Sequence, residues 1–285
     1  MRSHKRRRSI VFWVSSHTRV KLLATTLMAA LVVFVFTNQL PADKTWTYWT
    51  LPLSGKVIMI DPGHGGVDGG ARSKAGLIEK DVTLQASLYL RDYLQQAGAI
   101  VRMTRDTDTD LARPETRGFS KRKTEDLKAR EALIASSGAD VFLSVHLNAI
   151  PSSRWYGAQT FYTHNHKDNP SLAWLVQDEI KNNVVKTDRV AKRIRGIYLL
   201  DQAAMPTALV EVGFLSNAAE AERLADPSYQ KALAAAMYRG ILRFLSGEKV
   251  PAKPYGDVML EDGSVELRPE EAETETDAHE HSSGG

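Results

Sequence analysis

The sequence predicts an α/β fold: a single large domain at residues 55–246, with a mostly parallel, twisted sheet covered by helices on both faces, preceded by one N-terminal transmembrane helix. Three observations support this fold class. Short apolar segments alternate with longer segments of helical periodicity throughout the domain. The apolar segments are nearly continuous, which is typical of strands buried on both faces. An apolar run with a basic flank lies before the domain.

The composition is that of an ordinary globular protein. The chain has 285 residues, of which 43% are hydrophobic and 25% charged, enough for one large domain with appendages. It contains no cysteine, which excludes disulfides, thiolate chemistry and cysteine-ligated zinc. Any transition metal must therefore be held by His, Asp or Glu. The sequence has no basic stripe with interleaved aromatic residues, so we expect no nucleic-acid partner.

The first 40 residues predict a membrane segment. Residues 1–21 contain seven Lys/Arg and no acidic residue, and residues 22–40 begin with the apolar run Leu22–Phe36. This run is short for a spanning helix, which needs roughly 20 residues, but it could extend if Lys21 snorkels and the residues after it reach the far interface. We therefore expect a basic cytoplasmic segment at 1–21 and a transmembrane anchor or signal-anchor at 22–40.

The alternative for this segment is a cleaved signal peptide. Asn38, Gln39 and Leu40 match a small-residue cleavage site poorly, which favours an uncleaved anchor. The basic flank should remain in the cytoplasm. The expected location is therefore membrane-anchored, with the main domain outside the cytoplasm; cleavage would instead give a secreted protein.

Two further segments flank the main domain. The expected linker at 41–54 contains Trp46, Tyr48 and Trp49, which suit a membrane–water interface but could equally pack on the domain. Residues 247–285 carry eleven Asp/Glu against three Lys/Arg and lack apolar periodicity. We expect them to form an acidic, disordered tail.

Within the domain, each element follows from periodicity and from Gly or Pro at its ends. Gly98 ends the first helix, and the polar segment 105–123, with Pro114 and Gly118, predicts a long loop. The expected strands are 57–60, 99–104, 141–146, 158–162, 197–200 and 207–212, and the expected helices are 79–97, 124–137, 172–185, 218–225 and 228–245.

The first candidate site residue is His64. It lies in Asp61-Pro62-Gly63-His64-Gly65-Gly66, directly after the first strand, where glycines allow a tight reversal and leave space around the imidazole. Ligands of open α/β sheets gather beyond the carboxyl ends of strands. The alternative is an ordinary glycine-rich turn with a surface histidine.

Three more candidates follow. Glu79 begins the first helix, where it could be a ligand or simply complement the helix dipole. His146 ends an apolar strand and could be a ligand or a core histidine, and Asn148 could be a hydrogen-bonding group near the site or a turn residue. Glu211 lies inside the apolar strand 207–212, where an ionised carboxylate is costly unless it is paired or metal-bound.

Together these residues suggest a metal-dependent hydrolase. Catalytic zinc commonly takes two histidines and a glutamate plus an open position, and a second carboxylate can then serve as general base. The spacing alone does not determine which glutamate binds the metal.

The chain resembles the zinc-dependent N-acetylmuramoyl-L-alanine amidases in four motifs, in the same order. These motifs are residues 60–71, Glu79, the segment Ser144-Val145-His146-Leu147-Asn148-Ala149 and the segment Glu211-Val212-Gly213-Phe214-Leu215-Ser216-Asn217. The resemblance implies an amidase catalytic domain at 55–246, with Zn²⁺ held by His64, Glu79 and His146 and with Glu211 as catalytic acid/base. It also implies hydrolysis of the amide between the muramic acid lactyl group and L-alanine of peptidoglycan.

Segments 49–56, 147–152 and 157–162 are more specifically similar to the sporulation/germination-specific members of this family. That similarity implies a role in spore cortex maturation: the enzyme strips the stem peptide, and a muramic acid deacetylase then allows the muramic δ-lactam to form. The catalytic domain would then lie in the forespore intermembrane space. His164 and His166 lie outside the family pattern and could bind a second metal or belong to a solvated loop.

Three alternatives remain open at this point. A vegetative autolysin for cell separation would be favoured by wall-binding repeats, which the sequence lacks. A non-catalytic peptidoglycan-binding module would be favoured by loss of a site residue, and all four are present. A zinc carboxypeptidase would share the same ligand chemistry.

Overall fold

The computed structural model describes residues 15–37 and 51–250, which belong to two compact units, Met1–Thr50 and Leu51–Gly285. In the first unit, helix α1 spans Ser16–Thr37. Its window Ser16–Phe34 is long and apolar enough to cross a membrane, a test that a signal sequence also passes. The expected tail beyond residue 250 and the linker aromatic residues lie outside the described residues.

A six-stranded sheet forms the centre of the second unit, in the order β2-β1-β3-β6-β4-β5. Its strands are β1 (Val57–Pro62), β2 (Ile100–Met103), β3 (Val141–Asn148), β4 (Gln159–Tyr162), β5 (Lys192–Arg193) and β6 (Thr207–Phe214). Strands β2, β1, β3 and β6 are parallel, and β4 runs antiparallel to β6. The prediction of a mostly parallel sheet is therefore confirmed.

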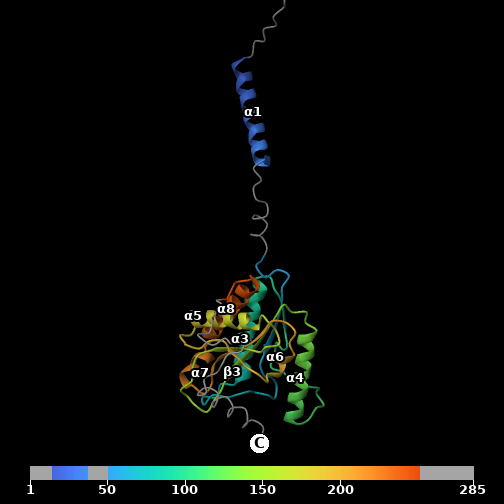
Figure 1. Ribbon diagram of the computed structural model, residues 1–285, viewed down its shortest axis with the longest axis vertical. Coiled ribbons are helices and arrows are strands. Elements are labelled where there is room, and N and C mark those ends of the chain that lie inside the picture. The colour runs from blue at the N-terminus through green and yellow to red at the C-terminus, as the bar shows by residue number, and fades with distance from the viewer. Residues whose placement is uncertain (1–14, 38–50, 251–285) are drawn as a thin grey trace, which may run out of the picture. The chain divides into compact units, whose positions relative to one another are not determined.

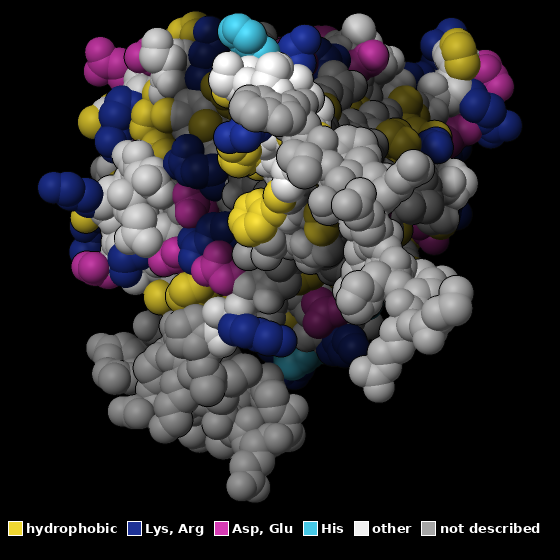
Figure 2. Space-filling model, turned by 90° about the horizontal axis from the view of Figure 1, so that it is seen from above, with side chains coloured by type: hydrophobic (Ala, Val, Ile, Leu, Met, Phe, Trp, Pro, Cys, Tyr) yellow, Lys and Arg dark blue, Asp and Glu magenta, His cyan; other side chains and the backbone are white. Residues whose placement is uncertain are grey.

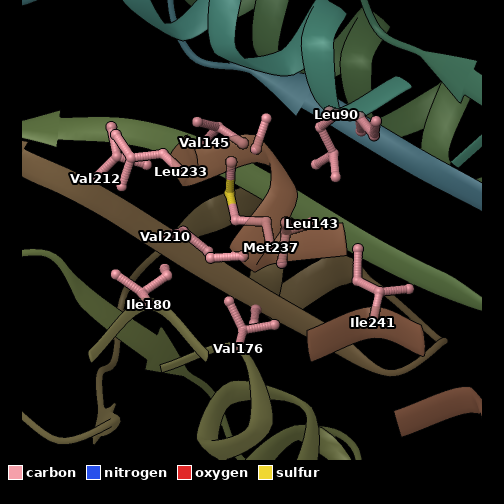
Figure 3. Packing of buried hydrophobic residues seen from close by; sticks show 14 of the residues in the cluster. Leu90, Leu143, Val145, Val176, Ile180, Val210, Val212, Leu233, Met237 and Ile241 are labelled. Carbon is pink, nitrogen blue, oxygen red and sulfur yellow. The ribbon is translucent and has the colours of Figure 1, made fainter. Parts of the chain in front are cut away.

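Helices cover both faces of this sheet (Figure 1). The helices of the second unit are α3 (Glu79–Gln96), α4 (Phe119–Ala135), α5 (Asn169–Asn183), α6 (Tyr198–Gln202), α7 (Ala218–Ala225) and α8 (Pro227–Leu245). The larger hydrophobic core joins α3, α5 and α8 to one face, where Met237 of α8 lies among Leu143, Val145 and Val210 (Figure 3). A smaller core joins α4 and α6 to the other face.

The sheet face under α4 and α6 changes from apolar to polar side chains along the strands. Its apolar half includes Met59, Phe142 and Leu209, which pack in the smaller core. Side chains alternate between faces along a strand, so the residues two positions further on point to the same side. These are Asp61, Ser144 and Glu211, and the carboxyl edge of this face is therefore polar.

Most expected elements are confirmed, and three details differ. The segment 197–200 was expected to be a strand but forms helix α6. A short apolar run does not show whether its hydrophobic residues follow a strand or a helix period. In α6, Leu199 and Leu200 are buried in the smaller core. Helix α4 begins at Phe119, within the expected loop, and Arg122 near its start forms an ion pair with Asp110 of that loop at 2.5 Å. Strand β5 has two residues and was not expected.

The charges on the molecular surface are mixed in sign. On the face seen in Figure 2, Lys and Arg side chains are spread over the described surface and lie among Asp and Glu side chains. The same mixture is seen in local ion pairs such as Arg91–Asp92 and Arg243–Asp178. Charge on that face therefore does not divide into a basic and an acidic region.

Candidate active site

Three of the candidate residues converge at the carboxyl edge of the sheet. Glu79, at the start of α3, lies between the two histidines: its Oε2 is 3.2 Å from Nε2 of His64, and its Oε1 is 3.1 Å from Nδ1 of His146. One ligand atom from each residue lies within 4.8 Å of the others, and these three form the one such metal-binding group in the described part of the chain.

The glycine-rich loop after β1 allows this close approach. His64 itself has a φ of 62°, in the left-handed region, so the loop reverses direction at the candidate ligand. A Cβ atom at Gly63 would lie 2.4 Å from the ring of His146, and one at Gly70 would lie 2.5 Å from Oε2 of Glu79. These two positions therefore require glycine because the imidazole and carboxylate groups occupy the space.

Two buried arginines hold the backbone of the same loop. Arg105 donates to the carbonyl oxygens of Pro62 and Gly63, and Arg130 donates to those of Pro62 and His64. Three successive carbonyl groups thus accept hydrogen bonds from side chains that are only 2–3% exposed. Neither arginine was among the candidates from sequence. Arg130 lies in a helix that is otherwise rich in exposed charged residues, so no local sequence pattern marks it as buried.

Asp61 anchors this network from β1. Its carboxylate accepts hydrogen bonds from Thr104, Ser144 and Arg130, and it is almost fully buried. Burial alone would raise the pKa of Asp61, but the Arg130 guanidinium and the Thr104 hydroxyl outweigh it and lower the pKa to about 2. The carboxylate is therefore ionised at neutral pH and holds Arg130 in place beneath the loop.

We expect Arg130→Met to lower the free energy of unfolding by roughly 3–5 kcal/mol, because it leaves Asp61 and Asp126 as buried charges without their partner. Arg113→Met is the matched control, since Arg113 is 72% exposed and its pair with Glu125 is a surface pair that should contribute much less. Denaturant unfolding measures both. Similar small losses for the two variants would contradict a supporting role for Arg130.

The histidine ligand candidates are held by carboxylates. Nδ1 of His64 lies 3.0 Å from Asp68, and this contact leaves Nε2 directed toward Glu79. Burial opposes a charge on His64, but Asp68 and Glu79 raise its pKa to about 9. The contacts with His146 and His64 lower the pKa of Glu79 despite its burial. A metal ion binds neutral imidazole, so metal binding here must release a proton and should strengthen as pH rises.

Glu211 lies beside this group on β6. It is directly opposite His146 in the sheet, and its Oε2 atom is buried with no hydrogen-bond partner among the described residues. Burial raises the pKa of Glu211 to about 7, although His146 opposes the shift. A carboxyl group with this pKa can both accept and release a proton near neutral pH. The two glutamates that sequence spacing could not distinguish therefore have different surroundings.

The other polar candidates have local roles. Nδ1 of His166 accepts a hydrogen bond from the backbone of Asp168, and His164 packs against the ring of Tyr162. Neither histidine belongs to a metal-binding group of the described residues, so the solvated-loop alternative is favoured for this pair. The backbone oxygen of Asn148 accepts a hydrogen bond from Leu215 and joins the ends of β3 and β6.

Glu220, at the first turn of α7, was missed from sequence. It is fully buried and accepts backbone hydrogen bonds from Gly157 and Phe214. It therefore ties the loop before β4 to the end of β6, beside the candidate site. In sequence it resembles an ordinary capping glutamate, and only its burial distinguishes it.

An α/β domain that gathers two histidines and a glutamate at one point, beside a carboxylate with a raised pKa, has the groups of a metal-dependent hydrolase. The family description for N-acetylmuramoyl-L-alanine amidases (Amidase_3) matches residues 58–243. The chain belongs to this family of enzymes.

Particular relatives agree with this assignment. A Bacillus subtilis (strain 168) protein called germination-specific N-acetylmuramoyl-L-alanine amidase is 49% identical, over 82% of this chain and 98% of its own length. The structure of the CwlD amidase from Clostridioides difficile, in complex with the GerS lipoprotein, matches with a TM-score of 0.66 and 40% identity over 68% of this chain and all of that chain. The amidase AmiC2 of Nostoc punctiforme matches with a TM-score of 0.58 and 31% identity, over 68% of this chain and 99% of its own.

Proposed function

We propose that this amidase hydrolyses the bond between the muramic acid lactyl group and L-alanine of peptidoglycan, with Zn²⁺ held by His64, Glu79 and His146 and with Glu211 as catalytic acid/base. The observation that carries the proposal is the His–Glu–His group beside the unpartnered Oε2 atom of Glu211. The family membership supplies the substrate class.

The three ligand candidates fit zinc in chemistry and spacing. Two histidines and a glutamate are a common set for catalytic zinc, and ligand atoms about 2.0–2.2 Å from a tetrahedral zinc lie roughly 3.4 Å apart. Oε2 of Glu79 is 3.2 Å from His64 and its Oε1 is 3.1 Å from His146, each close to that value, and one ligand atom from each of the three residues lies within 4.8 Å of the others. Zinc bound there would supply a Lewis acid that polarises the scissile carbonyl and lowers the pKa of water.

The proton transfers fall to Glu211. Its ionised carboxylate takes a proton from the attacking water as the oxygen adds to the lactyl carbonyl carbon. The protonated Glu211 then gives this proton to the nitrogen of L-alanine as the carbon–nitrogen bond breaks. The products are a free lactyl carboxylate and a peptide with a free amino terminus, so one water is consumed and the proton count balances.

The reaction is tested by mass spectrometry of purified peptidoglycan after incubation with zinc-loaded protein. We expect free stem peptides that begin with L-alanine, and glycan strands whose lactyl groups carry no peptide. A zinc carboxypeptidase would instead release single amino acids from the peptide ends. Products of that second kind, or no products at all, would refute the proposal.

The pH dependence of activity follows from the raised pKa of Glu211. A general base must be ionised, so activity should fall as pH drops through that pKa, which burial raises from 4.5 to about 7. A bound cation lowers the pKa of a neighbouring carboxylate. We therefore expect the acid limb of kcat/KM for the zinc enzyme to lie between these two values, with zinc content measured at each pH. A profile that stays flat below pH 4.5 would contradict this role.

We infer further that the enzyme acts in spore cortex maturation, followed by a muramic acid deacetylase that allows δ-lactam formation. The similarity over nearly the whole length of the germination-specific relative supports this role over that of a vegetative autolysin. Deleting the gene should give spores whose cortex lacks muramic δ-lactam, and a Glu211→Gln copy should fail to restore it. Normal cortex together with defective cell separation would favour the autolysin role.

The proposed location is the outer side of the membrane, with α1 as the anchor. The apolar helix near the amino terminus and the extracytoplasmic substrate support it. Protease added to intact protoplasts should remove the catalytic domain, and protection of the domain would contradict the proposal. A soluble product that begins near residue 40 would identify α1 as part of a cleaved signal peptide.

A further inference from the structure

An arginine packs against two aromatic rings at the same sheet edge as the candidate active site. The guanidinium carbon of Arg189 is 4.6 Å from the ring centre of Phe214 and 5.3 Å from that of Trp155. Its Nε donates to the backbone oxygen of Tyr156, and its Nη1 donates to Oε1 of Gln159. Four contacts thus fix the orientation of a side chain that would otherwise be flexible.

The sheet register places this cluster beside the catalytic groups. Gln159 is directly opposite Glu211, which in turn is directly opposite His146, so the three side chains share one face. Adjacent strands are about 4.8 Å apart, which puts Gln159 roughly 10 Å from His146. Arg189 is bonded to Gln159 and therefore lies one strand beyond the proposed general base, on the same face.

Arg189 has no ion-pair partner within the described residues, which is unusual for a cation that is partly buried. The nearby carboxylate of Glu220 is engaged by backbone amides of Gly157 and Phe214. Burial lowers the pKa of Arg189, and Glu220 only partly offsets this. Nη2 makes no hydrogen bond among the described residues, Arg189 is only partly buried, and its neighbour Trp155 is 44% exposed, so this cluster lies at the protein surface.

We propose that Arg189, packed against the rings of Trp155 and Phe214, binds a carboxylate of the stem peptide and makes the enzyme selective for anionic peptides. This inference rests on the proposed amidase function. The guanidinium carbon lies over the rings of Phe214 and Trp155, and the N–H groups at the guanidinium edge match a planar carboxylate. Gln159 is roughly 10 Å from His146 and Arg189 lies beyond it, and an extended peptide spans about 3.3–3.6 Å per residue, so the bound carboxylate should lie at least about three residues beyond the scissile bond. The glycan strand offers neutral hydroxyl and acetamide groups there, which would leave the cation unpaired.

The test compares two soluble muramyl peptides, one with free carboxylates and one with every peptide carboxylate amidated. We expect the wild-type enzyme to prefer the free form by about 10- to 100-fold in kcat/KM, the range for a hydrogen bond to a charged group. Arg189→Gln should lose this preference, mainly through a higher KM for the free form, because the contact is remote from the reacting atoms. Arg189→Lys should keep part of the preference through its charge. Lys186→Gln, an exposed cation of the same loop, is the control and should behave as wild type.

Three outcomes would overturn the inference. If the wild-type enzyme cleaves both peptides equally, the inference is overturned. This comparison needs no variant, so it holds even if Arg189→Gln does not fold. Equal losses on both substrates in Arg189→Gln, at unchanged melting temperature and zinc content, would indicate a glycan or purely structural role. An unchanged preference in that variant would exclude Arg189 as its source. Failure of the wild type to release peptide from either substrate would instead refute the proposed function.

Discussion

Glu211→Gln should lower turnover by at least about 100-fold while zinc content and melting temperature stay close to wild type. The substitution preserves the shape of the side chain and removes its basicity. No described residue forms an ion pair or hydrogen bond with Oε2 of Glu211, so the amide should not break a structural contact. Burial already favours the neutral form of this group, which makes a neutral amide easy to accommodate.

Measuring turnover, zinc content and melting temperature on one sample separates the possible roles of Glu211. Glu222→Gln removes an exposed carboxylate of α7 and should match wild type in all three. A large fall in melting temperature with normal turnover of the folded fraction would make Glu211 structural. Loss of zinc would make Glu211 a ligand and leave Glu79 as the candidate base.

His146→Ala should lower zinc from about one ion per chain to a small fraction of that value and abolish most activity. It removes one of the three proposed ligands, and changing even an outer partner of a metal ligand typically costs about 10- to 100-fold in affinity or activity. Elemental analysis of purified protein measures the zinc, and kcat/KM on muramyl peptide measures the activity. Added zinc should restore activity poorly, because the site has lost a donor atom rather than merely the ion.

His166→Ala is the matched control, since His166 lies outside the metal-binding group; its Nδ1 accepts a hydrogen bond from the backbone of Asp168 and lies 3.8 Å from the carboxylate of the same residue. It should retain about one zinc per chain, as in wild type. Zinc content unchanged in both His64→Ala and His146→Ala would disprove the ligand assignment. A drop in His166→Ala would revive the possibility of a second metal bound by the His164 and His166 loop.

Three of the four candidate site residues stand out in the sequence because each departs from its local pattern, whereas Glu79 matches an ordinary first-turn glutamate. His64 stands among glycines after a strand, His146 ends an apolar strand, and Glu211 is a charge within one. Such departures are visible over a few residues, since strand burial and turn geometry are local properties. The same locality explains why the alternation of strands and helices predicted the α/β class correctly.

The supporting residues could not be identified this way. Arg130 donates hydrogen bonds to loop carbonyl groups that are 66 and 68 residues away in sequence. Gln159 accepts a hydrogen bond from Arg189, which is 30 residues away in sequence. Nothing near either arginine in sequence marks it as buried. The segment 197–200 shows the same limit in secondary structure, because its apolar residues suit a strand or a helix until α4 packs against it.

The sequence by itself determined the fold class, the amidase family resemblance and the four residues with the chemistry of a metal-dependent hydrolase. The tertiary structure decided how those residues relate: Glu79 contacts both histidines across as many as 67 positions, while Glu211 lies opposite His146 with a buried oxygen that has no hydrogen-bond partner in the described part of the chain. The physical reason is that a residue's chemistry is carried by its side chain, whereas its ionisation and partners depend on distances between segments. Those distances are set only when the strands pair and the helices pack.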